Sequence, residues 1–188
     1  MSTLPREEAE KRFLHDIRDH EIDIQLDDGL NRVIKCSRPK SWVFGFYIIS
    51  SPGSIYMYGD MGSLGVERLP DMFEFVSDSA GDLSYFLSKA PRDFITKEYS
   101  SDLADEFMNK HIYEQFPDEE DKEKIEQLKE DLSCSFYEET KDEFYRILYE
   151  SNLNFDCEFP EVDSYTYHTI WKVEAMKWAV KKYYDQKK

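Results

Sequence analysis

The sequence contains no apolar run close to the roughly 20 residues that a membrane-spanning helix requires. Cysteine is also scarce, and the three thiols at positions 36, 134 and 157 are far apart and odd in number. This spacing excludes a Cys-x-x-Cys metal site and fits buried thiols in a reducing compartment rather than a disulfide framework. The opening residues, MSTLPREEAEKR, lack the apolar stretch of a signal peptide. We therefore expect a cytosolic type of protein that does not bind membranes.

Basic residues are few relative to acidic ones. The chain has 24 Lys or Arg against 40 Asp or Glu, which gives a net charge of −16 at pH 7. Because nucleic-acid binding depends on basic patches that neutralise phosphates, we expect no direct contact with DNA or RNA. Motifs for catalysis are missing too: the chain has no Gly-x-Ser-x-Gly elbow, Walker loop, dinucleotide-binding glycine fingerprint or His-Glu-x-x-His. We therefore predict no cofactor, and we favour a function other than catalysis.

A strand-rich stretch at residues 21–67 is the clearest structural signal that is present. Ile22, Ile24 and Leu26 alternate with polar residues, the period of a half-buried strand. The apolar run WVFGFYIIS at residues 42–50 predicts a central strand that is covered on both faces. Turn residues separate these segments from further strands near residues 32–37 and 54–58. The stretch therefore predicts an antiparallel meander of about four strands.

Helical patterns surround the predicted sheet, so we expect the α+β class. Apolar residues recur at helical spacing in several segments, namely residues 6–19, 82–89, 102–114, 118–132, 136–153 and 165–184, and a short helix should begin near Pro70. The last of these helices is apolar over most of its circumference and should close the core. A chain of 188 residues predicts a single domain at 1–188. Its core would comprise residues 22–76 and 164–185, with an acidic helical insert at 98–163.

The tetrapeptide Gly59-Asp60-Met61-Gly62 concentrates backbone freedom just after the predicted fourth strand. One interpretation is a bulge or loop that leads into the helix near Pro70. Another is a loop at residues 59–71 whose backbone approaches a ligand. In this second interpretation the protein is a small enzyme, and its polar contacts come from a set of charged side chains: Asp60, Glu67, Arg68 and Asp71.

Two histidines and two carboxylates lie near the end of the first predicted helix. His15 and Asp19 are four residues apart, as are Asp16 and His20, so each pair shares a helix face. Imidazole and carboxylate groups bind divalent transition metals, which makes His15, Asp19 and His20 the candidates for a metal site. The alternative is a solvated helix end, and we predict that no metal binds.

Four segments resemble a family of uncharacterised tailed-phage proteins. Members share DDGL, GDMG, R..DMF.F and YTYHFIW-like patterns, and here the matching segments are LDDGLNR, IISSPGSIYMYGDMGSL, RLPDMFEFV and SYTYHTIWKVEAMKWAVKKYYD. The match covers residues 22–76 and 164–185. The resemblance implies a phage or prophage gene that is expressed in the bacterial host cytoplasm, and it implies no activity. The acidic middle of the chain departs from the family pattern, so a function in that region lies outside the resemblance.

The excess negative charge lies in that acidic middle. Residues 98–163 contain 22 acidic and 6 basic side chains, a net of −16, whereas the other 122 residues contain 18 of each sign. We expect a basic host protein as partner, such as a nuclease of a restriction or CRISPR system with a positively charged cleft. The predicted partner-binding carboxylates are Asp118, Glu119, Glu120, Asp121, Glu123, Glu126, Glu130, Asp131, Glu138, Glu139, Asp142 and Glu143. Two alternatives are an acidic surface that serves solubility and a structural or assembly module of the phage.

Overall fold

The computed structural model describes residues 6–79, 81–115, 140–150 and 160–188. The chain divides into two compact units. Leu4–Thr96 and Tyr165–Lys188 form one, here called the sheet unit, and Lys97–Ser164 form the other, here called the acidic unit. The bounds of the acidic unit lie within one residue of the predicted insert. The single domain expected for the whole chain stays a prediction.

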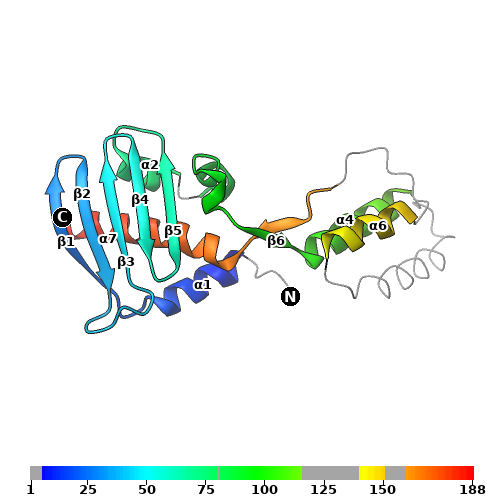
Figure 1. Ribbon diagram of the computed structural model, residues 1–188, viewed down its shortest axis with the longest axis horizontal. Helices are drawn as coiled ribbons and strands as arrows, with labels where there is room; N and C mark the ends of the chain where they lie inside the picture. The colour runs from blue at the N-terminus through cyan, green and yellow to red at the C-terminus, as the bar shows by residue number, and fades with distance from the viewer. Residues whose placement is uncertain (1–5, 80, 116–139, 151–159) are drawn as a thin grey trace. The chain divides into compact units, whose positions relative to one another are not determined.

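A five-stranded antiparallel sheet dominates the sheet unit, and its strands are neighbours in chain order (Figure 1). The strands are β1 (Glu21–Asp28), β2 (Asn31–Ser37), β3 (Phe46–Ser51), β4 (Ser54–Gly59) and β5 (Gly62–Glu67). The α+β class and the meander at residues 21–67 are therefore confirmed, with β3 as the central strand. The register of β1 against β2 shifts between Ile24 and Leu26, where β1 contains a bulge.

The Gly-Asp-Met-Gly segment is a tight hairpin turn and not a loop that leads into a helix. Gly59 pairs with Gly62 across the turn, so that β5 returns along β4. Gly62 has a φ of +90°, a conformation that glycine adopts without strain. The sequence predicted about four strands, and β5 is the fifth. The glycines at 62 and 65 interrupt its apolar alternation. Its buried residues, Leu64 and Val66, nevertheless keep the period of a strand.

The prediction of one covered strand at residues 42–50 was wrong in two respects. β3 begins only at Phe46, because a turn precedes it in which Phe44 has a φ of +59° and the amide of Gly45 donates to Trp42 O at 2.7 Å. In addition, Phe46 and Ile48 are buried while Ile49 is exposed. Only one face of the sheet is therefore covered by the core.

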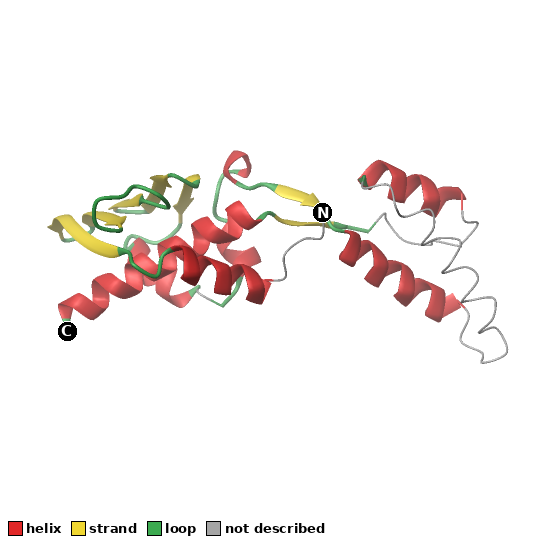
Figure 2. Cartoon of the chain, turned by 90° about the horizontal axis from the view of Figure 1, so that it is seen from below, coloured by secondary structure: helices red, strands yellow, loops and turns green. Residues whose placement is uncertain are grey.

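The helices of the sheet unit cover that one face. They are α1 (Arg6–Asp16), α2 (Met72–Asp78), α3 (Leu83–Leu87) and α7 (Tyr167–Lys187), with a 3₁₀ turn η1 (Arg92–Phe94) beside β5. Figure 2 shows α1 and α7 on the same side of the sheet. The helix expected from Pro70 begins two residues later, after the N-cap Asp71. The terminal helix is capped by Thr166, whose side chain accepts a hydrogen bond from Thr169 N.

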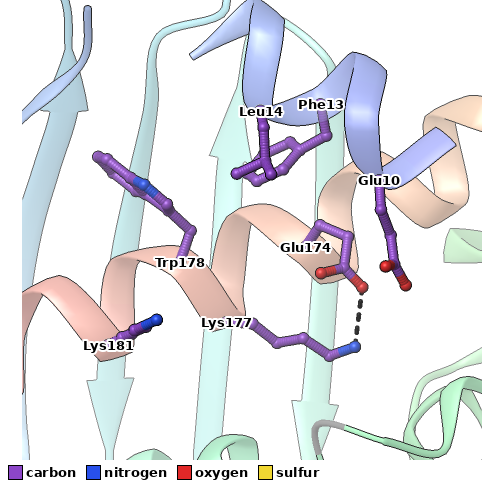
Figure 3. A pocket seen from close by; sticks show the side chains of 7 residues that line it. All are labelled: Glu10, Phe13, Leu14, Glu174, Lys177, Trp178 and Lys181. Atoms are coloured by element: carbon purple, nitrogen blue, oxygen red, sulfur yellow. Dashed lines mark hydrogen bonds and ion pairs between the residues drawn. The ribbon is translucent and has the colours of Figure 1, made fainter. Parts of the chain in front are cut away.

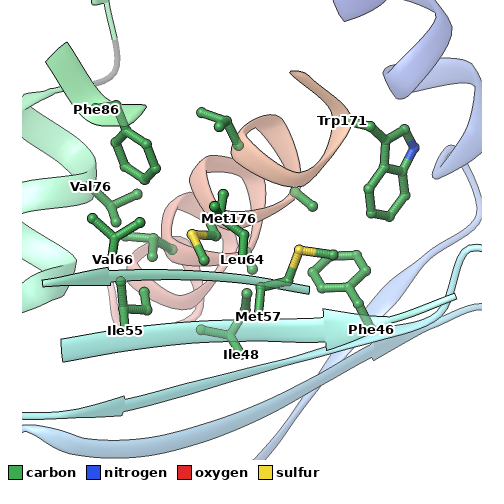
Figure 4. Packing of buried hydrophobic residues seen from close by; sticks show 14 of the residues in the cluster. Phe46, Ile48, Ile55, Met57, Leu64, Val66, Val76, Phe86, Trp171 and Met176 are labelled. Atoms are coloured by element: carbon green, nitrogen blue, oxygen red, sulfur yellow. The ribbon is translucent and has the colours of Figure 1, made fainter. Parts of the chain in front are cut away.

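The core lies between the sheet and α7. Side chains from β3, β4 and β5 point toward Met176 of α7 in Figure 4, and Phe46, Ile48 and Met57 are fully buried. Trp171 is also fully buried, with its ring centroid 5.4 Å from that of Phe13 and 5.5 Å from that of Phe46. The terminal helix therefore closes the core, as its apolar circumference predicted.

The acidic unit contains a helix pair and a two-stranded sheet. Its described elements are β6 (Lys97–Tyr99), α4 (Ser101–Gln115), α6 (Lys141–Glu150) and β7 (Asp163–Tyr165), the last of which ends in the sheet unit. Ala104 and Met108 of α4 are buried in one small cluster with Phe144 and Leu148 of α6. β6 and β7 were not predicted, because three residues are too few to display a period. The helix predicted at residues 118–132 lies outside the described residues.

Candidate functional site

One face of α4 in the acidic unit presents three carboxylates. Asp102, Asp105 and Glu106 are exposed, while Ala104 and Met108 on the opposite side are buried. The carboxylates are separated by three and four residues, which places them next to one another on a helix. Burying the apolar side of α4 against α6 therefore turns this acidic face outward.

The carboxylates of α4 lie close enough to affect one another. Partial burial raises the pKa of the Asp105 carboxyl, and the negative charge of Asp102 raises it further. The pKa of the Tyr99 hydroxyl is raised as well, mainly by burial and in addition by Asp105. Burial is the larger cause of both shifts, and the neighbouring carboxylate adds to it in each case. The face therefore brings Asp102 and Asp105 close enough for their charges to interact.

Three of the four basic residues in the described part of the acidic unit form ion pairs within that unit. Lys97 pairs with Glu161, Lys141 with Asp163, and Arg146 with Glu143. Arg146 also lowers the pKa of Glu143. The described residues of this unit contain ten acidic and four basic side chains, a net of −6.

The predicted partner-binding carboxylates fall into two groups. Asp142 is exposed on α6, and Glu143 is half-buried and bound to Arg146. The ten that precede them, from Asp118 to Glu139, lie outside the described residues. Asp102, Asp105 and Glu106 were not among the predicted residues, although their spacing on a predicted helix indicates a shared face.

Asp60 of the Gly-Asp-Met-Gly turn has a structural contact. Its Oδ2 accepts a hydrogen bond from the amide of Phe44 at 2.9 Å, and its own amide donates to Gly45 O at 2.9 Å. These two bonds hold the turn at residues 42–45 in the conformation with positive φ at Phe44. The role of Asp60 in this structure is therefore to fix the approach to β3.

The other three loop candidates are placed apart from the turn. Asp71 caps α2 by accepting from Phe73 N at 2.9 Å, and it binds Arg32 through both carboxylate oxygens. Arg68 donates its amide to Gly53 O, and Glu67 donates its amide to Lys89 O. The four residues thus belong to different parts of the hairpin and α2, and none of these contacts brings them to one point.

The three metal candidates do not form one site. His20 is buried, and its Nε2 lies 3.1 Å from Phe44 O, whereas His15 and Asp19 are exposed. Arg18 pairs with Asp19 and lies 3.4 Å from His15 Nε2. Within the described ranges, no group of three His, Cys, Asp or Glu side chains is arranged to hold a metal ion.

A shallow groove of about 220 Å³ lies between α1 and α7 (Figure 3). Its apolar part is formed by Phe13, Leu14 and Trp178, and its polar residues are two carboxylates and two lysines. Glu174 binds Lys177 at 2.8 Å. The groove therefore has no excess of either charge with which to select an ionic ligand.

No family model, curated protein or solved structure matches the chain. Among the described residues, no helix is both long and apolar enough to cross a bilayer.

Proposed function

We propose that this chain is a phage-encoded binding protein whose acidic unit inhibits a basic, nucleic-acid-handling defence enzyme of the bacterial host. An anti-restriction or anti-CRISPR protein acts in this way. The proposal depends on one observation, the division of charge between the units. The acidic unit has 22 acidic and 7 basic residues, a net of −15, whereas the sheet unit has 18 and 17, a net of −1.

A charge requirement for solubility alone would be met by carboxylates distributed over both units. Here the excess negative charge is confined to one compact unit with its own small core, and three of the four basic residues in the described part of that unit form ion pairs within it. The acidic face of α4 is the described part of the surface that a basic cleft would contact. Electrostatic complementarity of this kind raises association rates and selects for basic partners.

The phage origin is supported by the resemblance of residues 22–76 and 164–185 to tailed-phage proteins. Two of the recurring residues in that resemblance, Asp60 and Asp71, have structural roles. We therefore assign the shared segments to the scaffold and the inhibitory function to the acidic unit, which departs from the family pattern.

A pull-down from bacterial host lysate with the full chain tests this proposal. We expect capture of a basic nuclease or nucleic-acid-binding complex that elutes as the salt concentration rises, because ions screen the attraction. The purified partner should also lose nuclease activity when the chain is added. A partner without basic character, or binding that salt does not weaken, would argue against the proposal.

A matched pair of triple variants locates the contact. Asp102→Asn, Asp105→Asn and Glu106→Gln together remove three charges from α4 and should weaken capture at least tenfold. The control triple, Glu7→Gln, Glu8→Gln and Asp78→Asn, removes three exposed charges from the sheet unit and should bind as the wild type does. Equal loss in both variants would mean that net charge alone, and not the α4 face, determines binding.

A further inference from the structure

The sheet face opposite α1, α2 and α7 carries a row of five aromatic side chains. In order they are Trp42, Tyr47, Tyr58, Tyr56 and Phe94, and successive ring centroids are 5.5, 5.2, 6.2 and 6.0 Å apart. Tyr47 and Tyr58 are directly opposite each other on β3 and β4, and their rings stack at an interplanar angle of 16°. The row therefore forms one continuous surface across the centre of the sheet.

Large apolar side chains gather around this row. Six of the ten exposed large hydrophobic residues in the described chain lie on this face or in the turn beside it, with exposures between 37 and 52%: Leu26, Trp42, Val43, Ile49, Tyr56 and Tyr58. The register places Val33 opposite Ile49, next to the tyrosines. Contiguous apolar patches of this kind mark interaction sites, and Trp and Tyr are frequent in the residues that dominate binding energy.

The charges around the row restrict what can cover it. Exposed carboxylates border the face on β1, at Glu21, Asp23 and Asp28, and on β5, at Glu67. On this face the three central strands β2, β3 and β4 have one charged side chain, that of Lys35. It lies opposite Asp23, and its Nζ is 6.0 Å from the centroid of the Trp42 ring. A nucleic acid would place phosphates against this acidic border, which is unfavourable. A cationic cleft of the kind proposed for the acidic unit would gain little from the apolar centre.

We propose that the occupant is a second copy of this chain, which stacks its own aromatic row on the first through a two-fold axis. Antiparallel sheets pack face to face at about 10 Å with interdigitating side chains. Five strands at about 4.8 Å and six residues at about 3.3 Å give a footprint of roughly 480 Å² per copy. Two copies would bury roughly 1,000 Å², which is at the lower limit for a specific interface. The dimer is therefore weak and depends on concentration.

Salt affects this dimer in a characteristic direction. The acidic borders and the net charge of −16 on each copy repel at low ionic strength, while the apolar row attracts regardless of it. Added NaCl therefore strengthens the dimer. The basic partner proposed for the acidic unit is released by salt, so the two interactions separate by the sign of their salt dependence. The dimer does not require the proposed inhibitory function.

Sedimentation velocity of the full chain tests the inference, over concentrations from about 1 to about 200 µM and at low and high NaCl. We expect a monomer at the low end and a dimer at the high end, with the dimer fraction rising with salt. Tyr58→Lys places a cation in the centre of both contacting faces and should shift the dissociation constant at least tenfold. Tyr149→Lys is the matched control, because Tyr149 is highly exposed on α6 and the substitution changes the charge equally.

Both variants must first show the far-UV circular dichroism and melting temperature of the wild type, which is expected because both tyrosines contact solvent. A wild type that is monomeric throughout the concentration range, or a Tyr58→Lys variant that dimerises as Tyr149→Lys does, would overturn the inference. So would a labelled single-stranded oligonucleotide that binds the wild type but not Tyr58→Lys, since this result would assign the face to nucleic acid.

Discussion

The carboxylate of Asp71 accepts two hydrogen bonds from the guanidinium of Arg32, at 2.8 and 3.0 Å, across 39 positions of the chain. The Arg32 guanidinium also lies 4.5 Å above the ring of Phe73 and 5.5 Å from that of Tyr183. Tyr183 in turn donates its hydroxyl to Asp27 at 2.8 Å. The segments LDDGLNR, RLPDMF and KKYYD, distant in sequence, therefore meet at one buried arginine.

Replacing Asp71 with Asn tests the value of this ion pair. Asn can still cap α2 through its side-chain oxygen, so the substitution mainly removes the charge that compensates Arg32. Because the Arg32 side chain is only 9% exposed, we expect a loss of about 3 kcal/mol in the free energy of unfolding, measured by urea denaturation. Asp78→Asn, at the exposed end of the same helix, is the control and should change stability by less than about 0.5 kcal/mol.

The pH dependence of the same pair has a definite sign. The hydrogen bonds from Arg32 lower the pKa of Asp71 below its ordinary value of 3.8. The unfolded chain therefore binds this proton more readily than the folded chain does, and the stabilisation is present above pH 3.8 and lost as pH falls through the lower, folded pKa. The free energies of unfolding of the wild type and of Asp71→Asn, measured as a function of pH, should therefore converge in that range. Parallel curves would show that the carboxylate is not responsible.

The meander and its helices could be predicted from the sequence because local periodicity encodes them. The apolar alternation of β1 predicted a strand, and the nearly continuous apolar surface of the terminal helix predicted that this helix closes the core. The pairing of Arg32 with Asp71 and the turn at Phe44 could not be predicted, since both depend on partners brought together by the folded chain. In the candidate site, the charge partition was visible in the sequence. Only the burial of Ala104 and Met108 indicates which carboxylates of α4 face outward.

Two glycines of the hairpin differ sharply in the space around them. A Cβ on Gly59 would lie 2.2 Å from Gly45 O and 2.6 Å from Phe46 Cα, both backbone atoms that cannot move independently. A Cβ on Gly65 would meet the Tyr56 ring at 3.1 Å, and a ring can shift. We expect Gly59→Ala to cost at least about 2 kcal/mol and Gly65→Ala less than about 1 kcal/mol, by thermal and urea denaturation. Equal costs would contradict the close approach of β4 to residues 45–46.

His20 should make the sheet unit sensitive to mild acid. Burial lowers the pKa of its imidazole below 6.5, and the positive charge of Arg38 lowers this pKa further. The hydrogen bond to Phe44 O and the negative charge of Asp19 raise the pKa, but burial outweighs them. The folded state therefore binds the proton less readily than the unfolded state, and stability is full above pH 6.5 and falls below it. His20→Gln retains a donor for Phe44 O without a titrating group.

The measurement is the difference in unfolding free energy between wild type and His20→Gln, from about pH 8 to about pH 5. The many carboxylates titrate in both proteins, so their contribution to the pH dependence cancels in this difference. We expect the advantage of the wild type to shrink as pH falls through this interval. A constant difference would mean that the imidazole has the same pKa in the folded and the unfolded chain.

The two ends of the acidic unit leave the sheet unit at one hydrogen-bonded junction. Thr166 N donates to Thr96 O at 3.0 Å, and Thr96 N donates to Thr169 Oγ1 at 3.0 Å. A linker of about three residues, Gly-Ser-Gly, could therefore replace residues 97–164 without stretching the chain. The remaining sheet unit keeps its five strands, α1, α2 and α7, together with the main buried cluster. We expect this shortened chain to fold by itself.

The shortened chain should unfold cooperatively, with a free energy of at least about 5 kcal/mol by urea denaturation. It should retain salt-strengthened dimerisation through the aromatic row and lose capture of the basic partner, because the two surfaces lie on different units. Tyr58→Lys in the same shortened chain serves as the control, since it should abolish dimerisation and leave cooperative unfolding intact. A broad, non-cooperative transition would instead mean that the sheet unit requires the acidic unit to fold, and the insert would then be part of one indivisible domain.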